Sequence, residues 1–263
     1  MKKIEFFSTI DGVSDVAPII EAKDLKMPWI EKTKQDYKQR LAVSNGETFF
    51  HVARCPAIMD LLQTGYIISS FCDIAIETIK DRPDGFSWII PNSDLTDLMF
   101  ENENCEIIQN HSLTHGTTAK YVPQPPNTLE TVIKINTPWH MVVPKGMKVL
   151  MLPVPYTENF AFTACSGIWE PSMSSNINIQ LYWNNLDGKY FIKAGTPLAH
   201  LILLSDEKFE FECRDANEKD KKWLKKRKYF QNMSFMLKRN ILKTSYDKHF
   251  NQESKCPFHK WFK

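Results

Sequence analysis

No apolar run in the 263-residue chain approaches the roughly 20 residues that cross a bilayer, so we expect no membrane span. The first residues, MKKIEFFSTIDG, lack a long apolar core and already contain Glu5 and Asp11, which argues against a signal peptide. The six cysteines include no CxxC pair. This pattern favours reduced, mostly buried thiols in an intracellular protein over a disulfide framework.

The sequence also lacks the common catalytic signatures. It contains no phosphate-binding P-loop, no GxGxxG motif, no Ser–His–Asp spacing and no paired catalytic carboxylates. His111 and His115 are four residues apart, as zinc ligands on a helix often are. Thr114 and Gly116 favour a loop there instead, and the acid of an HExxH motif is missing. We therefore expect no metal site, and the sequence names no cofactor.

The composition is that of an ordinary folded protein, with 43% apolar and 24% charged residues. Between 129 and 212, short β-rich runs alternate with turn signals at the spacing of a barrel or sandwich. Residues 92–128 are the longest loop-like region. We predict a mainly β protein, α+β overall. Residues 1–128 would supply N-terminal strands, short helices and a long loop packed on a barrel of 129–212, and 213–263 would form a basic helical tail.

The charges are divided unevenly along the chain. Residues 214–263 carry 15 Lys or Arg against 5 Asp or Glu, a net charge of +10, and residues 1–213 carry a net charge of −8. Apolar residues from Trp223 to Ile241 recur at helical spacing, which predicts one helix over 215–244. Its apolar face could dock on the barrel, or its basic side chains could bind a partner or the phosphates of a nucleic acid. The candidates are Lys221, Lys222, Trp223, Lys225, Lys226 and Arg227.

Four segments carry a family resemblance. They are Val143-Pro144-Lys145-Gly146, then residues 167–173 (GIWEPSM), 176–181 (NINIQL) and 192–202 (IKAGTPLAHLI). These segments resemble the barrel of the trimeric dUTPases and dCTP deaminases, over about a quarter of the chain. The resemblance implies a dUTPase-like β-clip barrel, and it alone implies a homotrimer.

The same resemblance suggests a site. The family's loop acid, which acts on a water or hydroxyl, falls on Glu170. The family's deoxyribose-packing ring falls on Met173 and its glutamine on His200, while the Arg-Ser-Ser phosphate-binding segment and the glycine-rich C-terminal lid have no counterpart. The Thr-Pro-Trp139 segment flanks a pocket or fills the core. The ligand-binding candidates are Trp169, Met173, Asn176, His200 and Trp139.

The chain from about 4 to 212 also resembles a family of tailed-phage proteins without a known activity. The resemblance rests on Met27-Pro28-Trp29, Arg54-Cys55-Pro56, Phe86-Ser87-Trp88 and other short motifs. It implies an accessory binding protein that meets a host protein or a nucleotide in the cytoplasm of the infected bacterium. The alternatives are a nucleotide-binding or nucleotide-modifying enzyme that uses Glu170, and nucleic-acid binding through the basic tail.

Overall fold

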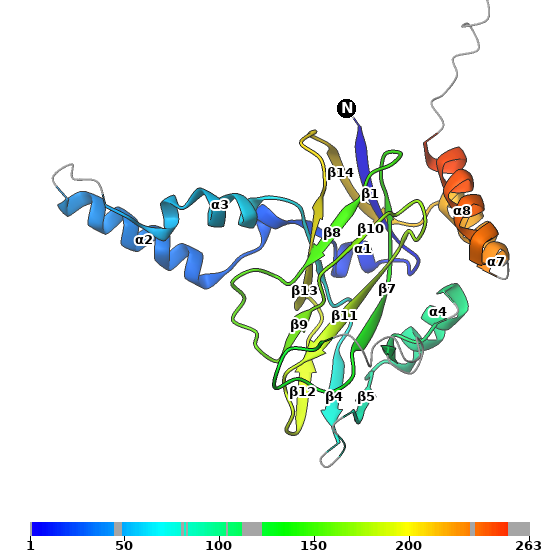
Figure 1. Ribbon diagram of the computed structural model, residues 1–263, viewed down its shortest axis with the longest axis horizontal. Helices are drawn as coiled ribbons and strands as arrows, with labels where there is room; N and C mark the ends of the chain where they lie inside the picture. The colour runs from blue at the N-terminus through cyan, green and yellow to red at the C-terminus, as the bar shows by residue number, and fades with distance from the viewer. Residues whose placement is uncertain are drawn as a thin grey trace, which may run out of the picture.

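The computed structural model describes residues 2–44, 49–79, 82, 84–103, 105–111, 123–231 and 235–251. Figure 1 shows strands gathered in the middle of the molecule with helices on either side. Helix and strand contents are nearly equal, at 32% and 31%. The predicted mixture of helices and strands is therefore confirmed, but the prediction of a mainly β protein is wrong, because helices contribute as much as strands.

The first sheet joins strands from both ends of the chain. Its strand order is β14-β1-β7-β11-β9, with β6 also paired to β7. Strand β1 lies parallel to β14 and antiparallel to β7, so the predicted N-terminal, central and C-terminal segments all meet in this sheet. The strands are β1 (Lys3–Ser8), β6 (Ile108–Asn110), β7 (Ile133–Val142), β9 (Phe162–Ala164), β11 (Asn176–Trp183) and β14 (Glu210–Asp215).

Two smaller sheets complete the strand framework. The second sheet has the order β10-β8-β13-β3-β2, and the third has the order β12-β4-β5. The second sheet contains β2 (Ile20–Glu21), β3 (Tyr66–Ser69), β8 (Val149–Leu152), β10 (Gly167–Trp169) and β13 (Pro197–Leu203). The third contains β4 (Ile74–Thr78), β5 (Phe86–Ile89) and β12 (Lys189–Ile192).

The main hydrophobic core is built by side chains of all three sheets. Phe6 from β1, Leu201 from β13 and Ile74 from β4 are all completely buried in it. Among the described residues, each sheet is an open path of strands and none is closed into a barrel. Strand β9 belongs to the first sheet and β10, the next strand along the chain, to the second, and no described strand pairs with both. The closed barrel predicted for 129–212 is therefore absent from the described part, and the dUTPase-like relationship stays a prediction.

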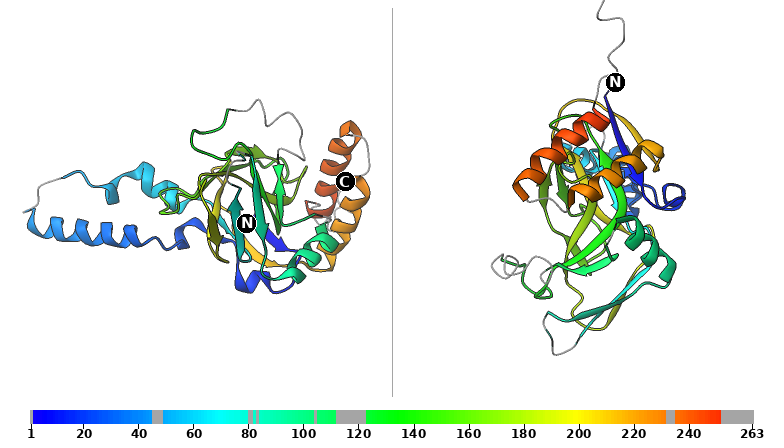
Figure 2. Two further views of the ribbon diagram at one scale, coloured as in Figure 1. Left: turned by 90° about the horizontal axis from the view of Figure 1, so that it is seen from below. Right: turned by 90° about the vertical axis from the view of Figure 1, so that its right-hand side faces the viewer.

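Short helices and one long helix connect the strands of the N-terminal half. Helices α2 and α3 form an arm that extends away from the sheets (Figures 1 and 2). Pro28 and Pro56 occupy the first turns of α2 and α3, where a missing N–H leaves no hydrogen bond unmade. The elements are α1 (Val13–Val16), η1 (Ala22–Asp24), α2 (Pro28–Val43), η2 (Val52–Arg54) and α3 (Pro56–Gln63).

Two predictions about secondary structure are wrong. Residues 92–128 are not simply a loop, because they contain α4 (Ser93–Glu103) and β6. Helix α4 was missed because it buries only Met99 and Glu103, which leaves no apolar periodicity to detect. The tail forms two helices, α7 (Glu218–Gln231) and α8 (Phe235–Phe250), in place of one. Residues 232–234 between them lie outside the described residues, as does Met233 of the predicted stripe.

Candidate functional site

A cavity of about 250 Å³ lies between β10 and the first half of β11. We call it the amide cleft, because Asn176, Asn178 and Gln180 line one wall. Trp169 and Ser166 stand on the β10 side. The cleft therefore joins residues of the predicted dUTPase-like loop to a strand of the first sheet.

The wall of the amide cleft follows from the alternation of β11. Successive side chains of a strand point to opposite faces of the sheet. Ile177, Ile179 and Leu181 are buried in the core, while Asn176, Asn178 and Gln180 between them are half-buried. The sequence N-I-N-I-Q thus produces a row of carboxamides on one face and a core-forming row on the other.

The cleft opens where the two large sheets part. Strand β9 pairs only with Leu181–Trp183 of β11, and the Cys165 N–H donates to the Gln180 carbonyl at 2.7 Å. Strand β10 pairs only with β8. The residues of β11 before Gln180 therefore face no neighbouring strand on that side within the described structure.

Three polar groups in the amide cleft are unused. The Trp169 Nε1–H is buried without a hydrogen-bond partner among the described residues. Among the described residues, the side-chain amides of Asn178 and Gln180 form no hydrogen bond. By contrast, Asn176 Nδ2 donates to the Thr137 carbonyl at 3.3 Å. The two carboxamides are therefore free to bind a ligand, whereas the indole N–H is unpaired but shielded from solvent.

The lining of the amide cleft carries no charged side chain. Its only titratable group is Cys165, and burial raises the pKa of that thiol to about 11. The thiol is therefore protonated at neutral pH and is a poor nucleophile. The cleft offers hydrogen bonds and an aromatic ring, but neither a base nor a counter-charge for phosphate.

Glu170 follows Trp169 in the chain but does not line the amide cleft. Its carboxylate pairs with Lys243 of α8 at 2.6 Å and accepts a hydrogen bond from Ser172 Oγ at 2.8 Å. Partial burial opposes ionisation, yet these two contacts outweigh it and lower the pKa of Glu170. The carboxylate that the family resemblance assigns to catalysis instead links the loop to the C-terminal helices.

The other predicted ligand-binding residues are scattered. Trp139 is completely buried in the core of β7, so of its two predicted roles, flanking a pocket or filling the core, the structure shows the second. Met173 lies in the turn after Glu170, where its N–H donates to the Glu170 carbonyl at 2.9 Å, and it does not line the cleft. His200 belongs to a different cavity, described next. Only Trp169 and Asn176 of the predicted set meet in the amide cleft.

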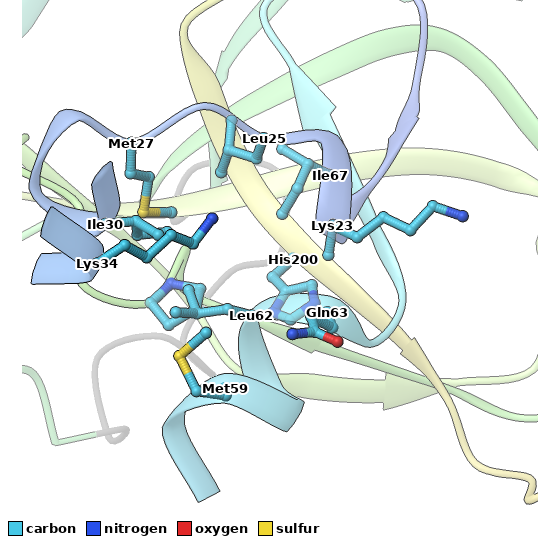
Figure 3. Close-up of a pocket in the computed structure, with 12 residues that line it drawn as sticks. Lys23, Leu25, Met27, Ile30, Lys34, Met59, Leu62, Gln63, Ile67 and His200 are labelled. Carbon is cyan, nitrogen blue, oxygen red and sulfur yellow. The ribbon is translucent and has the colours of Figure 1, made fainter. Parts of the chain in front are cut away.

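His200 stands at the base of a small apolar cavity of about 100 Å³ where the arm joins the second sheet. Figure 3 shows Leu25, Met27 and Ile67 around it. His200 Nε2 lies 2.5 Å from the Thr64 carbonyl, so this nitrogen carries the proton. Nδ1 is then an acceptor, and it has no partner among the described residues. Burial lowers the pKa of His200, so the ring is neutral at pH 7.

Both lysines at this cavity are already paired. Lys23 forms an ion pair with Glu21, and Lys34 pairs with Glu31 at 3.0 Å. Gly65, on the strand side, has a φ of +87°, a conformation that L side chains rarely adopt. The cavity is therefore mostly apolar, with Gln63 and His200 among its polar lining residues, and its size suits a water or a very small alcohol better than a nucleotide.

The basic tail docks on the outer face of the first sheet. Trp223 is only 2% exposed, and it packs with Phe7 and Val142 of the sheet and with Tyr246 of α8. Tyr246 Oη also accepts a hydrogen bond from the Val143 N–H at 2.9 Å. Of the two interpretations of the tail, docking of the apolar face is therefore what the structure shows.

A buried chain of polar side chains fixes this docking. Trp223 Nε1–H donates to Ser175 Oγ at 3.4 Å, and Ser175 Oγ lies 2.9 Å from His140 Nδ1. His140 Nε2 lies 2.8 Å from Glu103 Oε1, and Arg227 donates to Glu103 Oε2 at 3.1 Å. The chain thus ties α7 to β7 and to α4.

The hydrogen bonds of this chain run in one consistent direction. Burial lowers the pKa of His140, which favours the neutral ring. Burial opposes the charge of Glu103, but His140 and Arg227 beside it outweigh that effect and lower its pKa. A neutral His140 donates from Nε2 to the carboxylate and accepts at Nδ1 from Ser175. Every polar atom of the chain is then satisfied, which is what buried polar networks require.

A second clamp holds the start of α7. Arg214 on β14 donates to Asp220 Oδ2 at 2.5 Å and to Glu5 Oε2 at 2.6 Å. Asp220 is completely buried. The two clamps therefore fix both the position and the rotation of α7 on the sheet.

Sequence reasoning missed several of these residues. Asn178 and Gln180 were inside a predicted strand, and the alternation N-I-N-I-Q was a usable signal for a polar face. Ser175, Glu103 and Lys243 gave no local signal, because each acts on a residue far away in the chain. Only the folded structure places them together.

No three His, Cys, Asp or Glu side chains among the described residues lie close enough together to hold a metal ion. His115 lies outside that part of the chain, so its pairing with His111 is not placed. Within the described segments, no helix combines the length and apolar character that crossing a membrane requires.

Neither a scan against models of protein families nor a search of curated proteins finds a match to this chain. The function must therefore be inferred from the geometry of the chain itself.

Proposed function

We propose that this chain is a binding protein without catalytic turnover, and that the amide cleft holds the flat, uncharged part of a ligand of the nucleoside class. The observation that carries this proposal is the set of unused polar groups in a cleft without charge. Carboxamides both donate and accept hydrogen bonds, and Trp169 adds an aromatic ring to the lining. Such groups are complementary to the edge of a nucleobase.

The absence of charge in the cleft lining determines which ligands fit. Phosphate groups are held by Arg, Lys or clustered backbone N–H groups, and no Arg or Lys lines the amide cleft. A nucleoside or free base therefore fits better than a nucleoside triphosphate. The missing Arg-Ser-Ser segment is consistent with this choice.

The proposal of binding without turnover rests on Glu170 and Cys165. A general base works best with a pKa near the working pH. The pKa of Glu170 is lowered by its contacts with Lys243 and Ser172, and the pKa of Cys165 is raised to about 11. Neither group is poised to accept a proton or attack a substrate at neutral pH.

The sequence resemblances supply the finer parts of the proposal. We propose a dUTPase-like ancestry for the strands around the amide cleft, and an accessory role for a phage protein in the cytoplasm of the infected bacterium. The resemblance to trimeric enzymes also makes a homotrimer part of this proposal. Shared fold alone does not carry activity, so the loss of nucleotide hydrolysis is compatible with that ancestry.

Calorimetry and thermal unfolding with a panel of nucleosides, nucleoside triphosphates and free bases test the proposal. At about 100 times its dissociation constant, a ligand stabilises the folded protein by about 2.7 kcal/mol. We expect one nucleoside to bind, and its triphosphate to bind no more tightly. The double variant Asn178→Ala/Gln180→Ala should weaken binding about tenfold or more, because it removes both free amides.

Gln35→Ala/Gln39→Ala on the exposed side of α2 is the matched control, and it should bind like the native protein. Absence of binding across the panel would overturn the ligand class. Turnover of any nucleotide that Glu170→Gln abolishes would overturn the proposal of a non-catalytic protein.

A further inference from the structure

The docked face of α7 determines which of its side chains point outward. Trp223, Arg227 and Phe230 follow the spacing i, i+4, i+7 and form one face of the helix. Trp223 and Phe230 are buried against the sheet and α8, and Arg227 reaches the buried Glu103. Because this face is held by both apolar and polar contacts, the opposite face of α7 is turned to solvent in the described part of the chain. Figure 2 shows α7 and α8 together on the outside of the molecule.

The outward face carries a regular set of side chains. Lys222, Lys225, Lys226 and Tyr229 follow the spacing i, i+3, i+4, i+7, so they form one stripe along the helix. We call them the lysine stripe. All four are exposed, and Tyr229 keeps 68% of its surface accessible. At about 1.5 Å per residue, the stripe is about 10 Å long.

The lysines of the stripe have no acidic partner. Within the described residues, no ion pair includes Lys222, Lys225 or Lys226. The neighbouring lysines behave differently. Lys221 pairs with Glu218 at 3.4 Å, and Lys228 donates to the Glu101 carbonyl at 2.7 Å.

Two acidic side chains of α4 and α7 are buried and engaged elsewhere. Asp220 is bound to Arg214, and Glu103 is bound to Arg227 and His140. Lys222, Lys225 and Lys226 therefore stay without an acidic partner among the described residues, with Lys226 Nζ over the Phe230 ring at 5.9 Å. A helix that only needed a solvated face would not require an exposed aromatic ring among these charges.

We infer that the lysine stripe is a binding surface for single-stranded nucleic acid, independent of the amide cleft. The ammonium groups of lysines are point charges that suit phosphate oxygens, and they read no base sequence. An exposed aromatic ring stacks on an unpaired base, whereas a duplex keeps its bases stacked on one another. Three lysines around one tyrosine therefore match a short stretch of single strand, bound with little sequence preference.

Fluorescence anisotropy with a labelled single strand of about 20 thymidines tests this inference in the full-length protein. Three neutralised phosphates predict a slope of about −2 when the logarithm of affinity is plotted against that of salt concentration. In Lys222→Gln/Lys225→Gln/Lys226→Gln, affinity at about 50 mM salt should fall about tenfold or more, and the slope should approach zero. Tyr229→Ala should weaken binding about fivefold or more without changing the slope.

The matched control is Lys26→Gln/Lys32→Gln/Lys38→Gln, which removes the same charge from exposed positions on the arm and just before it. It should lower affinity far less than the stripe variant. Equal losses in the two triple variants would overturn the inference, since only total charge would then matter. Tighter binding of a duplex of the same length, or an unchanged affinity in Tyr229→Ala, would overturn the assignment to single strands. Nucleoside binding at the amide cleft should stay unchanged in all stripe variants.

Discussion

The arm and the C-terminal helix pair leave the sheets on opposite sides of the molecule, and they are attached in opposite ways (Figure 1). Helix α2 has 16 residues and buries none of them. Helix α7 has 14 residues and buries Trp223, Asp220 and Phe230. The shorter helix is therefore the one that the folded structure holds in place.

The difference teaches that tertiary contacts, and not helix length, decide how a helix is stabilised here. Helix α2 has exposed pairs such as Arg40–Asp36 at 2.8 Å, and each is worth only a few tenths of a kcal/mol. An isolated helix of this length is marginal in water. Helix α7 instead contributes to a hydrophobic cluster and to two buried ionic clamps. We expect perturbations of α7 to affect the whole fold, and those of α2 to stay local.

The largest expected effect follows truncation of a tryptophan. Trp223→Ala should lower the free energy of unfolding by about 3–5 kcal/mol, because it opens a cavity against the sheet and removes the donor to Ser175. Trp29→Ala at the base of the arm should cost about 1–2 kcal/mol, since that ring is only half-buried. Urea unfolding monitored by circular dichroism measures both. Equal losses of stability in the two variants would show that the arm and the C-terminal helix pair are held to the sheets equally strongly.

A smaller effect is expected from acid. The pKa of His140 is lowered in the folded state, so the unfolded chain takes up a proton first as the pH falls below about 6.5. Stability from His140 is therefore complete above that pH and is lost as the pH falls towards the folded pKa. The pKa of Glu103 is also lowered, so its contribution is lost at more acidic pH.

The pH dependence of urea unfolding between about pH 7.5 and 5 measures this loss. The pKa values of His200 and His249 are lowered as well, so they add to it with the same sign. His140→Asn should reduce the slope of the free energy of unfolding against pH. His200→Gln should show how much of that slope comes from the histidine in the cavity where the arm joins the second sheet. An unchanged slope in His140→Asn would show that the chain from Trp223 to Glu103 does not control acid stability.

The smallest effect is expected on the arm. Leu41 is 50% exposed on α2, so Leu41→Ala should change stability by no more than about 0.5 kcal/mol. Leu242, buried on α8, is the matched position, and Leu242→Ala should cost about 2–5 kcal/mol. The same unfolding assay measures both variants. A large loss in Leu41→Ala would mean that α2 is packed after all.

Local signals were enough to predict many elements of the fold. Pro56 is a residue type that favours a helix start, as it does in α3, and Ile74 and Ile76 alternate as the residues of strand β4 do. The split of the tail into α7 and α8 is not predicted, because the apolar spacing from Trp223 to Ile241 continues across it.

The arrangement of the sheets could not be predicted from local signals. The parallel pairing of Lys3 with Glu210 joins positions at opposite ends of the chain. The amide cleft exists because the pairing of β9 with β11 ends at Leu181, and no residue type in the sequence predicts that opening. Likewise Glu170 was recognised as a loop acid, but its role depends on Lys243 of another element. Long-range partners, not residue types, decided what each side chain does.

The parallel pair β1–β14 also has a consequence for biosynthesis. Phe6 and Phe7 of β1 are synthesised early. The parallel partner strand β14 ends at Asp215, which is synthesised 207 residues after its partner Ser8. At roughly 5–20 residues per second, that interval is about 10–40 s. During this time the first strand has an unpaired edge and two large apolar side chains to shelter. The nascent chain therefore depends on early pairing with β7, or on a chaperone, until its last strand arrives.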